Sequence, residues 1–250
     1  MRIRVAHLYP EYLNIYADRG NIAVLERRAR WRGLELEAEG VSLGDELRAD
    51  AHDLLYIGGG QDREQALIAP DLAARGPEIG EAIAGGAAVL AVCGGYQLLG
   101  RFYRGRDGTE LPGAGVFPLE TVAGEKRLIG DCLLECELEP GGRTTLAGFE
   151  NHAGITRLDE GAEPLGRVVA GYGNDGESAY EGVRLGSAVG TYLHGPLLPR
   201  NPWLADWLLE RALAHANGGD ASELAALPDH LEREAHDVAA GRARSRGGRS

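Results

Sequence analysis

The stretch Ala87-Ala-Val-Leu-Ala-Val-Cys93-Gly-Gly95 decides the fold, because an uninterrupted apolar run leads directly into a cysteine and two glycines. Six apolar residues without alternation are typical of a strand that is buried on both faces of a parallel sheet. The glycines allow a sharp turn, and a helical pattern follows around Gln97 to Phe102. This order of strand, turn and helix predicts a nucleophile elbow, which presents one reactive side chain at the end of a strand.

The residues before this stretch alternate between strand-like and helix-like patterns. Apolar runs at 3–8 and 54–57 predict two strands, and the alternation over 34–41, with Leu34, Leu36 and Ala38 on one face, predicts another. One helical pattern, with Asn21 as its expected N-cap, separates the first two strands. Another starts near Arg63, between the strand at 54–57 and the apolar run at 87–92. Apolar strands separated by helices predict an α/β fold with an open, mostly parallel sheet that helices cover on both faces.

The second half of the chain has a different character. Glycine and proline separate short strand-like runs over 111–193, so we expect a β-rich part that extends or wraps the sheet. A helix is predicted to return at Asn201-Pro202. We therefore expect one domain over 1–218 and a C-terminal helical extension over 219–250. Its last ten residues, GRARSRGGRS (241–250), are predicted to be disordered.

Composition narrows the class of protein. The chain has 250 residues and a net charge of −12, which argues against a broad surface for nucleic acid. Three cysteines are too few for a disulfide framework and favour a reduced, cytoplasmic protein. The N-terminus lacks the apolar core of a signal peptide. The longest uncharged run, 82–100, contains five glycines, which favour a strand, a turn and a helix over a membrane span.

Cys93 is the strongest candidate for a nucleophile. A helix N-terminus beyond it would lower the pKa of the thiol and offer N–H groups to a developing oxyanion. The alternative is a buried structural cysteine. Cys132 and Cys136 are expected to be core residues, because two cysteines four apart in a strand lie about 13–14 Å apart. That separation is too long for a disulfide or a shared metal ion.

A thiolate nucleophile needs a base, and His194 is the best candidate. It ends the apolar run Ser187–Leu193, at the end of a predicted strand, where open α/β sheets bind their ligands. His152 is the competitor, and a structural hydrogen bond suits it better. Other chemistries lack their motifs: there is no P-loop, dinucleotide fingerprint, zinc motif or Gly-x-Ser-x-Gly.

Three segments around these residues resemble those of class I (triad-type) glutamine amidotransferases. They are similar to the nucleophile segment, the oxyanion loop and the catalytic-histidine segment of that family, and stand here as AVCGGYQ (91–97), YIGGGQDREQ (56–65) and YLHGP (192–196). The resemblance runs in the right order over roughly residues 1–215.

Within that family the chain resembles the cobyric-acid-synthase-like branch. It is most similar to the GatD-type glutaminase subunits of lipid II isoglutaminyl synthases. The closer resemblance is carried by KRLIGD (126–131), GFENHAG (148–154) and YGN (172–174).

The resemblance implies an α/β glutamine amidotransferase fold and roles for individual residues. It makes Cys93 and His194 the catalytic pair. A triad acid is not identified, because Pro196 stands where many members have glutamate. The implied substrate-binding residues are Arg127, which would hold the α-carboxylate of L-glutamine, and Gly59, Gly60, Gly94 and Gln97.

The resemblance also implies a partner. No cofactor or metal is expected in this chain, whereas ATP and Mg²⁺ are expected in a Mur-ligase-like, MurT-type synthetase subunit that forms a heterodimer with it. That partner would use the ammonia to amidate the D-glutamate of lipid II to D-isoglutamine, in the cytoplasm at the inner face of the membrane. Two alternatives stay open: a different acceptor, such as that of a cobyrinate-type synthetase, and a non-catalytic regulatory protein.

Overall fold

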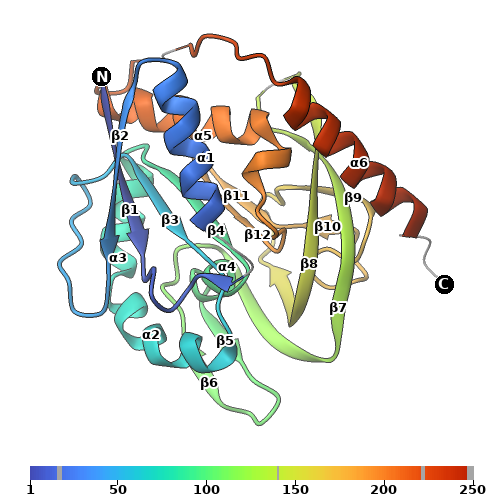
Figure 1. The fold of residues 1–250 in the computed structure, drawn as a ribbon. Coiled ribbons are helices and arrows are strands. Elements are labelled where there is room, and N and C mark those ends of the chain that lie inside the picture. The colour runs from blue at the N-terminus through green and yellow to red at the C-terminus, as the bar shows by residue number, and fades with distance from the viewer. Residues whose placement is uncertain (16–18, 140, 221–222, 247–250) are drawn as a thin grey trace.

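The centre of the molecule is a six-stranded sheet (Figure 1). The computed structural model describes residues 1–15, 19–139, 141–220 and 223–246. The strands follow the order β11-β12-β4-β3-β1-β2, and all neighbours are parallel except β11 and β12. Their bounds are β1 Arg2–Leu8, β2 Glu35–Val41, β3 Leu54–Ile57, β4 Ala88–Val92, β11 Val183–Leu185 and β12 Ala188–Thr191.

The helices lie on both faces of this sheet. Parallel connections are right-handed. The connection from β1 to β2 runs toward one edge of the sheet, and the connection from β3 to β4 runs toward the other edge. Because both connections have the same handedness, their helices lie on opposite faces of the sheet. Every residue of β3, β4 and β12 is buried, as a sheet covered on both faces requires. The predicted α/β fold is confirmed. The helices are α1 Arg19–Trp31, α2 Asp62–Ala74, α3 Gly76–Ala84, α4 Gly94–Leu98 and α5 Pro202–Ala216, with a 3₁₀ turn at Leu198–Arg200.

Most of the second half builds a separate sheet rather than extending the first. Of the described strands in this half, only β11 and β12 join the central sheet. The long strands β7 and β8 pair with each other along most of their length, so the hairpin forms the spine of a second six-stranded sheet. Its strands are β5 Phe102–Arg104, β6 Glu110–Pro112, β7 Leu119–Glu137, β8 Arg143–Leu158, β9 Gly166–Ala170 and β10 Tyr180–Glu181.

The helix that was expected to start after Asn21 begins earlier, at Arg19. Asn21 is buried and makes tertiary contacts instead of a cap. Its side-chain amide donates to Tyr56 Oη at 3.0 Å, and its Oδ1 accepts the N–H of Leu198 at 2.9 Å. The N-cap prediction was therefore wrong, because this polar side chain satisfies neighbouring elements.

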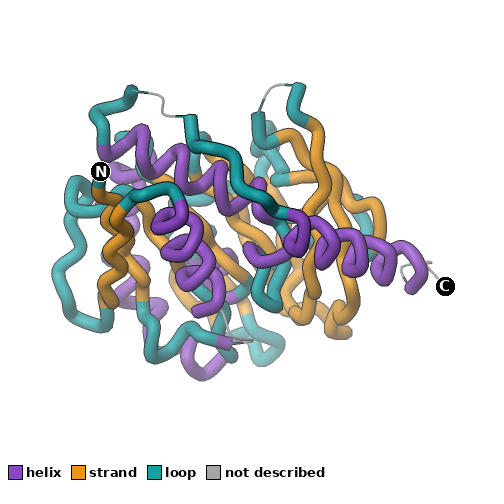
Figure 2. Tube along the Cα trace, turned by 45° about the horizontal axis from the view of Figure 1, so that its top comes forward, coloured by secondary structure: helices purple, strands orange, loops and turns teal. Residues whose placement is uncertain are grey.

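The C-terminal helix α6, His230–Arg246, lies over the second sheet (Figure 2). Ala240 and Ala243 pack against small and apolar residues of β7, β8 and β9. This packing explains why residues 241–246, predicted to be disordered, continue a helix. Residues 247–250 lie outside the described residues, and the domain division at residue 218 stays a prediction. Among the residues that the structure describes, no helix has the length and apolar character needed to cross a membrane.

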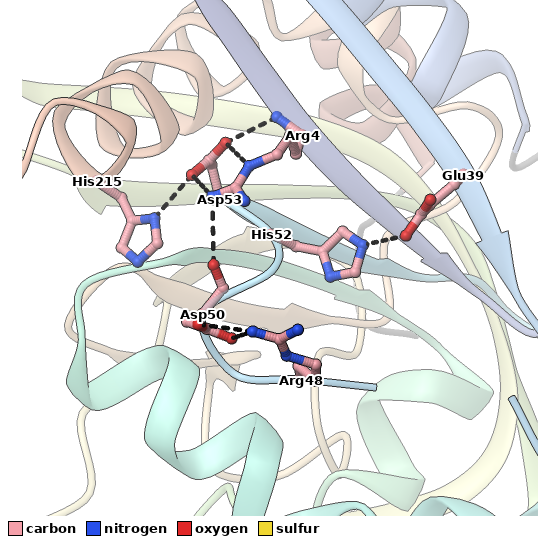
Figure 3. Close-up of polar contacts among 7 residues, drawn as sticks. All are labelled: Arg4, Glu39, Arg48, Asp50, His52, Asp53 and His215. Carbon is pink, nitrogen blue, oxygen red and sulfur yellow. Dashed lines mark hydrogen bonds and ion pairs between the residues drawn. The ribbon is translucent and has the colours of Figure 1, made fainter. Parts of the chain in front are cut away.

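A polar cluster joins β1, the start of β3 and α5 (Figure 3). Asp53 is buried and accepts the backbone N–H of Arg4 at 2.8 Å, Nη2 of the same arginine at 3.0 Å, and Nδ1 of His215 at 3.0 Å. The neighbouring His52 pairs with Glu39 at 2.6 Å. These groups stand at the amino end of β3, whereas catalytic sites of open α/β sheets lie at the carboxyl ends.

Candidate active site

Cys93 stands in a strained turn between β4 and α4. Its φ of 49° and ψ of −106° are unusual for a residue with a side chain. The neighbouring backbone is close enough that a β-carbon on Gly95 would lie 2.7 Å from Cγ1 of Ile57, so a glycine is needed there. The Cys93 N–H donates to the carbonyl of Thr191 at 2.8 Å, which ties the turn to β12. The turn predicted from the sequence is present.

Cys93 opens into a cavity of about 500 Å³ between the two sheets. Of the predicted site residues, Gly60, Cys93, Gln97 and Arg127 line this cavity. The wall is built from the carboxyl ends of β3 and β4 on one side and from β7 and β8 on the other. This is the end of a parallel sheet at which ligands are expected.

His194 lies beside Cys93 but does not line the cavity. It follows β12 and is fully buried. A β-carbon built on Gly59 would lie 3.1 Å from Cε1 of His194 and 3.2 Å from Cβ of Cys93, so both side chains flank the same glycine. Two backbone hydrogen bonds hold His194 against Phe149 of β8, its N–H at 2.8 Å and its carbonyl at 3.3 Å. The second sheet therefore fixes the position of this histidine.

The surroundings keep the His194 imidazole neutral. Burial, with smaller contributions from nearby His152 and Arg127, lowers the pKa of His194 to about 3. At pH 7 the ring is therefore unprotonated, which is the form that can accept a proton from a thiol.

Gly60 and Gly94 bring two backbone segments together next to the nucleophile. A β-carbon built on Gly94 would lie 3.0 Å from the backbone nitrogen of Gly60. One on Gly60 would lie 2.4 Å from Cδ2 of Leu13. The absence of a side chain at Gly94 therefore lets the loop after β3 lie directly against the residue that follows Cys93.

Arg127 places a positive charge on the cavity wall. It is an exposed residue of β7, and its Nε and Nη2 donate to the side-chain and backbone oxygens of Asn151 at 3.0 and 3.1 Å. Asn151 thus orients the guanidinium, which suits a carboxylate ligand.

His152 and Gln97 meet at Tyr192 behind the cavity. The His152 ring stacks on Tyr192, with centroids 3.5 Å apart, and its Nδ1 donates to the carbonyl of Gly154 at 2.7 Å. Burial lowers the pKa of His152 to about 4. Gln97 Nε2 donates to Tyr192 Oη at 3.1 Å. His152 has the structural hydrogen bond expected of it, yet it also lines the cavity.

Sequence reasoning missed several residues of the site. Ile15 and Gln65 line the cavity, and Asn151 holds Arg127. Gln65 stands inside the segment that resembles the oxyanion loop, so the motif could have indicated it. Glu181, which does not line the cavity, accepts the N–H of Tyr192, eleven residues later in the chain, at 2.6 Å. The third acid of a triad stays unassigned.

Comparison with known proteins identifies the family. Residues 4–202 match the CobB/CobQ-like glutamine amidotransferase domain. The chain is 41% identical over 210 residues to the lipid II isoglutaminyl synthase (glutamine-hydrolyzing) subunit GatD of Staphylococcus aureus strain N315, which covers 84% of each protein. It is 40% identical over 234 residues to the subunit of the same name from Streptococcus pneumoniae strain R6, covering 93% of this chain and 88% of that protein.

A solved structure supports the fold. The glutaminase domain of Trypanosoma brucei CTPS with bound acivicin superposes with a TM-score of 0.53 at 13% identity, over 88% of this chain and 96% of that one. With the family match over most of its length, the resemblance seen in the sequence is confirmed: this chain belongs to the CobB/CobQ-like family of glutamine amidotransferases.

Proposed function

We propose that this chain is the glutaminase subunit of a lipid II isoglutaminyl synthase. The observation that carries the proposal is the strained Cys93 next to a neutral His194, at a cavity whose far wall bears Arg127. The names of the two GatD relatives, which match this chain over most of its length, support the same assignment.

The first half of the reaction releases ammonia. The Cys93 thiol gives its proton to His194, and Sγ attacks the carboxamide carbon of L-glutamine. Backbone N–H groups of Gly94 and Gly60 stabilise the negative charge on the carboxamide oxygen. His194 then returns the proton to the leaving nitrogen, so ammonia departs and a γ-glutamyl thioester stays on Cys93.

The second half regenerates the enzyme. A water molecule gives a proton to His194 as its oxygen attacks the thioester carbon. The carbon–sulfur bond breaks, glutamate leaves and Cys93 regains its proton. Arg127 binds the α-carboxylate throughout, which fixes the amino acid at the end remote from the reacting carbon.

The ammonia needs an acceptor that another subunit activates. We place this acceptor, the D-glutamate of the lipid II stem peptide, on a Mur-ligase-like partner that binds ATP and Mg²⁺ and forms a heterodimer with this chain. The complex would work at the cytoplasmic face of the membrane, where it produces D-isoglutamine for peptidoglycan.

Covalent labelling tests the glutaminase half of the proposal. The chain is treated with 6-diazo-5-oxo-L-norleucine, a diazo-ketone analogue of glutamine, and the adduct is located by peptide mass spectrometry. We expect one adduct on Cys93, protection by excess L-glutamine, and slower labelling of His194→Ala. Absence of a Cys93 adduct in the wild-type chain, alone and with the partner, would support a non-catalytic regulatory protein instead.

Reconstitution tests the acceptor. A complex with the Mur-ligase-like subunit is given lipid II, ATP and either glutamine or ammonium chloride. We expect the wild-type complex to amidate lipid II with both nitrogen sources, and a complex with Cys93→Ala to use ammonium alone. Failure of the wild-type complex with both sources would point to a different acceptor.

A further inference from the structure

The three glycines after β3 are held through their carbonyl groups by three different parts of the chain. The carbonyl of Gly58 accepts the N–H of Gly95 at 3.1 Å. The carbonyl of Gly59 accepts the N–H of Ile15 at 3.1 Å. The carbonyl of Gly60 accepts Nε2 of Gln65, also at 3.1 Å. Three residues that have no side chains to anchor them are thus fixed peptide by peptide.

These hydrogen bonds also fix the directions of the backbone N–H groups. A trans peptide is planar, and its C=O and N–H point in opposite directions. The bond from Ile15 therefore turns the N–H of Gly60 away from Ile15. The hydrogen bond from Gln65 fixes the peptide group that follows Gly60. Without it, the dihedral angles of this glycine would be free. Removing either bond would let this residue rotate.

Gln65 is placed where it can serve this purpose. It lies in the first turn of α2 and is only 3% exposed. Its Nε2 lies 2.9 Å from the position that a β-carbon on Gly94 would occupy, and the Gly60 nitrogen lies 3.0 Å from the same point. The carboxamide is therefore packed between the glycine loop and the residue that follows the nucleophile.

We propose that Gln65 is a positioning residue of the glutaminase site, which holds Gly60 so that the oxyanion hole is already formed in the free chain. The inference rests on the proposed glutaminase function and adds to it. Gln65 acts through the loop and not on the substrate. Its loss should slow the chemical step and leave the binding of the amino acid unchanged.

The experiment compares Gln65→Met and Gln65→Glu with the wild-type chain. Methionine preserves length and burial but has no N–H donor, and a glutamate side chain would turn an acceptor toward the Gly60 carbonyl. Leu67→Met is the matched control, because Leu67 is an exposed residue of the same helix. Labelling by 6-diazo-5-oxo-L-norleucine gives the maximal rate kinact and the half-saturating concentration KI. Alkylation of Cys93 by iodoacetamide, which needs no oxyanion hole, reports thiol reactivity alone.

We expect kinact to fall about 10- to 100-fold in both variants, since losing an oxyanion donor outright costs about 100- to 1,000-fold. KI should stay within about threefold and the iodoacetamide rate within about twofold. If kinact of Gln65→Met and of Gln65→Glu equals that of the wild-type chain, the inference is overturned and the glutaminase proposal stands. A parallel loss of iodoacetamide reactivity would also overturn it, by indicating a general collapse of the site. A wild-type chain that is never labelled would instead refute the glutaminase proposal.

Discussion

Glu181, a fully buried residue, accepts the backbone N–H of Tyr192 at 2.6 Å, two residues before His194. Both oxygens of the same carboxyl group lie 3.0 Å from the hydroxyl oxygen of Thr191. It thus holds the end of β12, from which the histidine enters the site. Burial raises the pKa of Glu181 to about 8, against backbone and hydroxyl hydrogen bonds that lower it.

This carboxyl should make stability depend on pH. Because the folded pKa of about 8 lies above the ordinary value of 4.5, the folded state binds the proton more tightly. The contribution of the protonated Glu181 carboxyl to the free energy of unfolding is fully present below pH 4.5 and is lost as pH rises through 8. In Glu181→Gln the side chain stays neutral, so the wild type should lose about 2–4 kcal/mol relative to the variant between pH 5 and pH 8. Urea unfolding at both pH values measures the difference, and a constant difference would contradict the assignment.

Gly59→Ala should inactivate the site without unfolding the chain. The new methyl group would meet Cγ2 of Ile15 at 2.9 Å as well as the side chains of Cys93 and His194. Pushing the catalytic pair apart should lower kcat for glutamine hydrolysis about 10- to 100-fold. Ammonia release measures the rate, and circular dichroism confirms folding.

Gly80→Ala serves as the control for a glycine with open surroundings. Gly80 lies in α3, and apart from its chain neighbours and the backbone of its own helix no atom comes within 4 Å of a β-carbon built there. Alanine should raise the free energy of unfolding by about 0.5–1 kcal/mol, because it restricts the unfolded chain and favours helix. Glutaminase activity should equal that of the wild type. A Gly59→Ala enzyme as active as Gly80→Ala would show that Gly59 does not separate the pair.

Arg127→Ala should weaken glutamine binding rather than slow the chemistry. The guanidinium, oriented by Asn151, is the charge proposed to hold the α-carboxylate. We expect KM to rise about 10- to 100-fold with kcat within about threefold, because the contact is the same in ground and transition states. Lys126→Ala, at the exposed neighbouring position of β7, is the charge-matched control and should leave KM unchanged. If Arg127→Ala and Lys126→Ala have the same KM, Arg127 does not bind the α-carboxylate of glutamine.

The local parts of this site could be predicted from the sequence. The turn at Cys93 depends on residues that are adjacent in the chain, so the apolar run, the cysteine and the glycines were sufficient to indicate it. Its partner Gly60 was found in the same way, through the glycine run after β3.

The rest of the site depends on contacts between distant residues. The sequence placed His194 at a strand end, but the backbone bonds to Phe149 that fix it come from the second sheet, which was not predicted as a separate unit. Asparagine is a favoured N-cap residue, yet the hydrogen bonds of Asn21 to Tyr56 and Leu198 outweighed this local preference. The sequence predicted disorder over 241–246 because the surface that α6 covers, which includes Ala147, lies almost a hundred residues earlier in the chain.

Asp53, which contacts Arg4 and His215 (Figure 3), should stabilise the fold. It directly precedes β3, at the end of the sheet opposite the cavity. Burial would raise the pKa of Asp53, but hydrogen bonds from Arg4 and His215 outweigh this effect and the pKa lies below its ordinary value of 3.8. The contribution of the ionised Asp53 to the free energy of unfolding is therefore present above pH 3.8 and is lost as pH falls through the pKa of the folded state.

At pH 7 Asp53→Asn should lower the free energy of unfolding by about 1–3 kcal/mol. Most of this comes from the backbone N–H of Arg4 and from His215, whose side chain is 16% exposed, because the Arg4 side chain is 45% exposed and water screens its charge. Asp50→Asn is the matched control, since Asp50 pairs with Arg48 at the surface, and it should unfold like the wild type. In a double-mutant cycle with His215→Ala, measured by urea unfolding, we expect a coupling of about 1 kcal/mol that shrinks below pH 4. Strictly additive effects at pH 7 would show that the Asp53–His215 contact contributes nothing to stability.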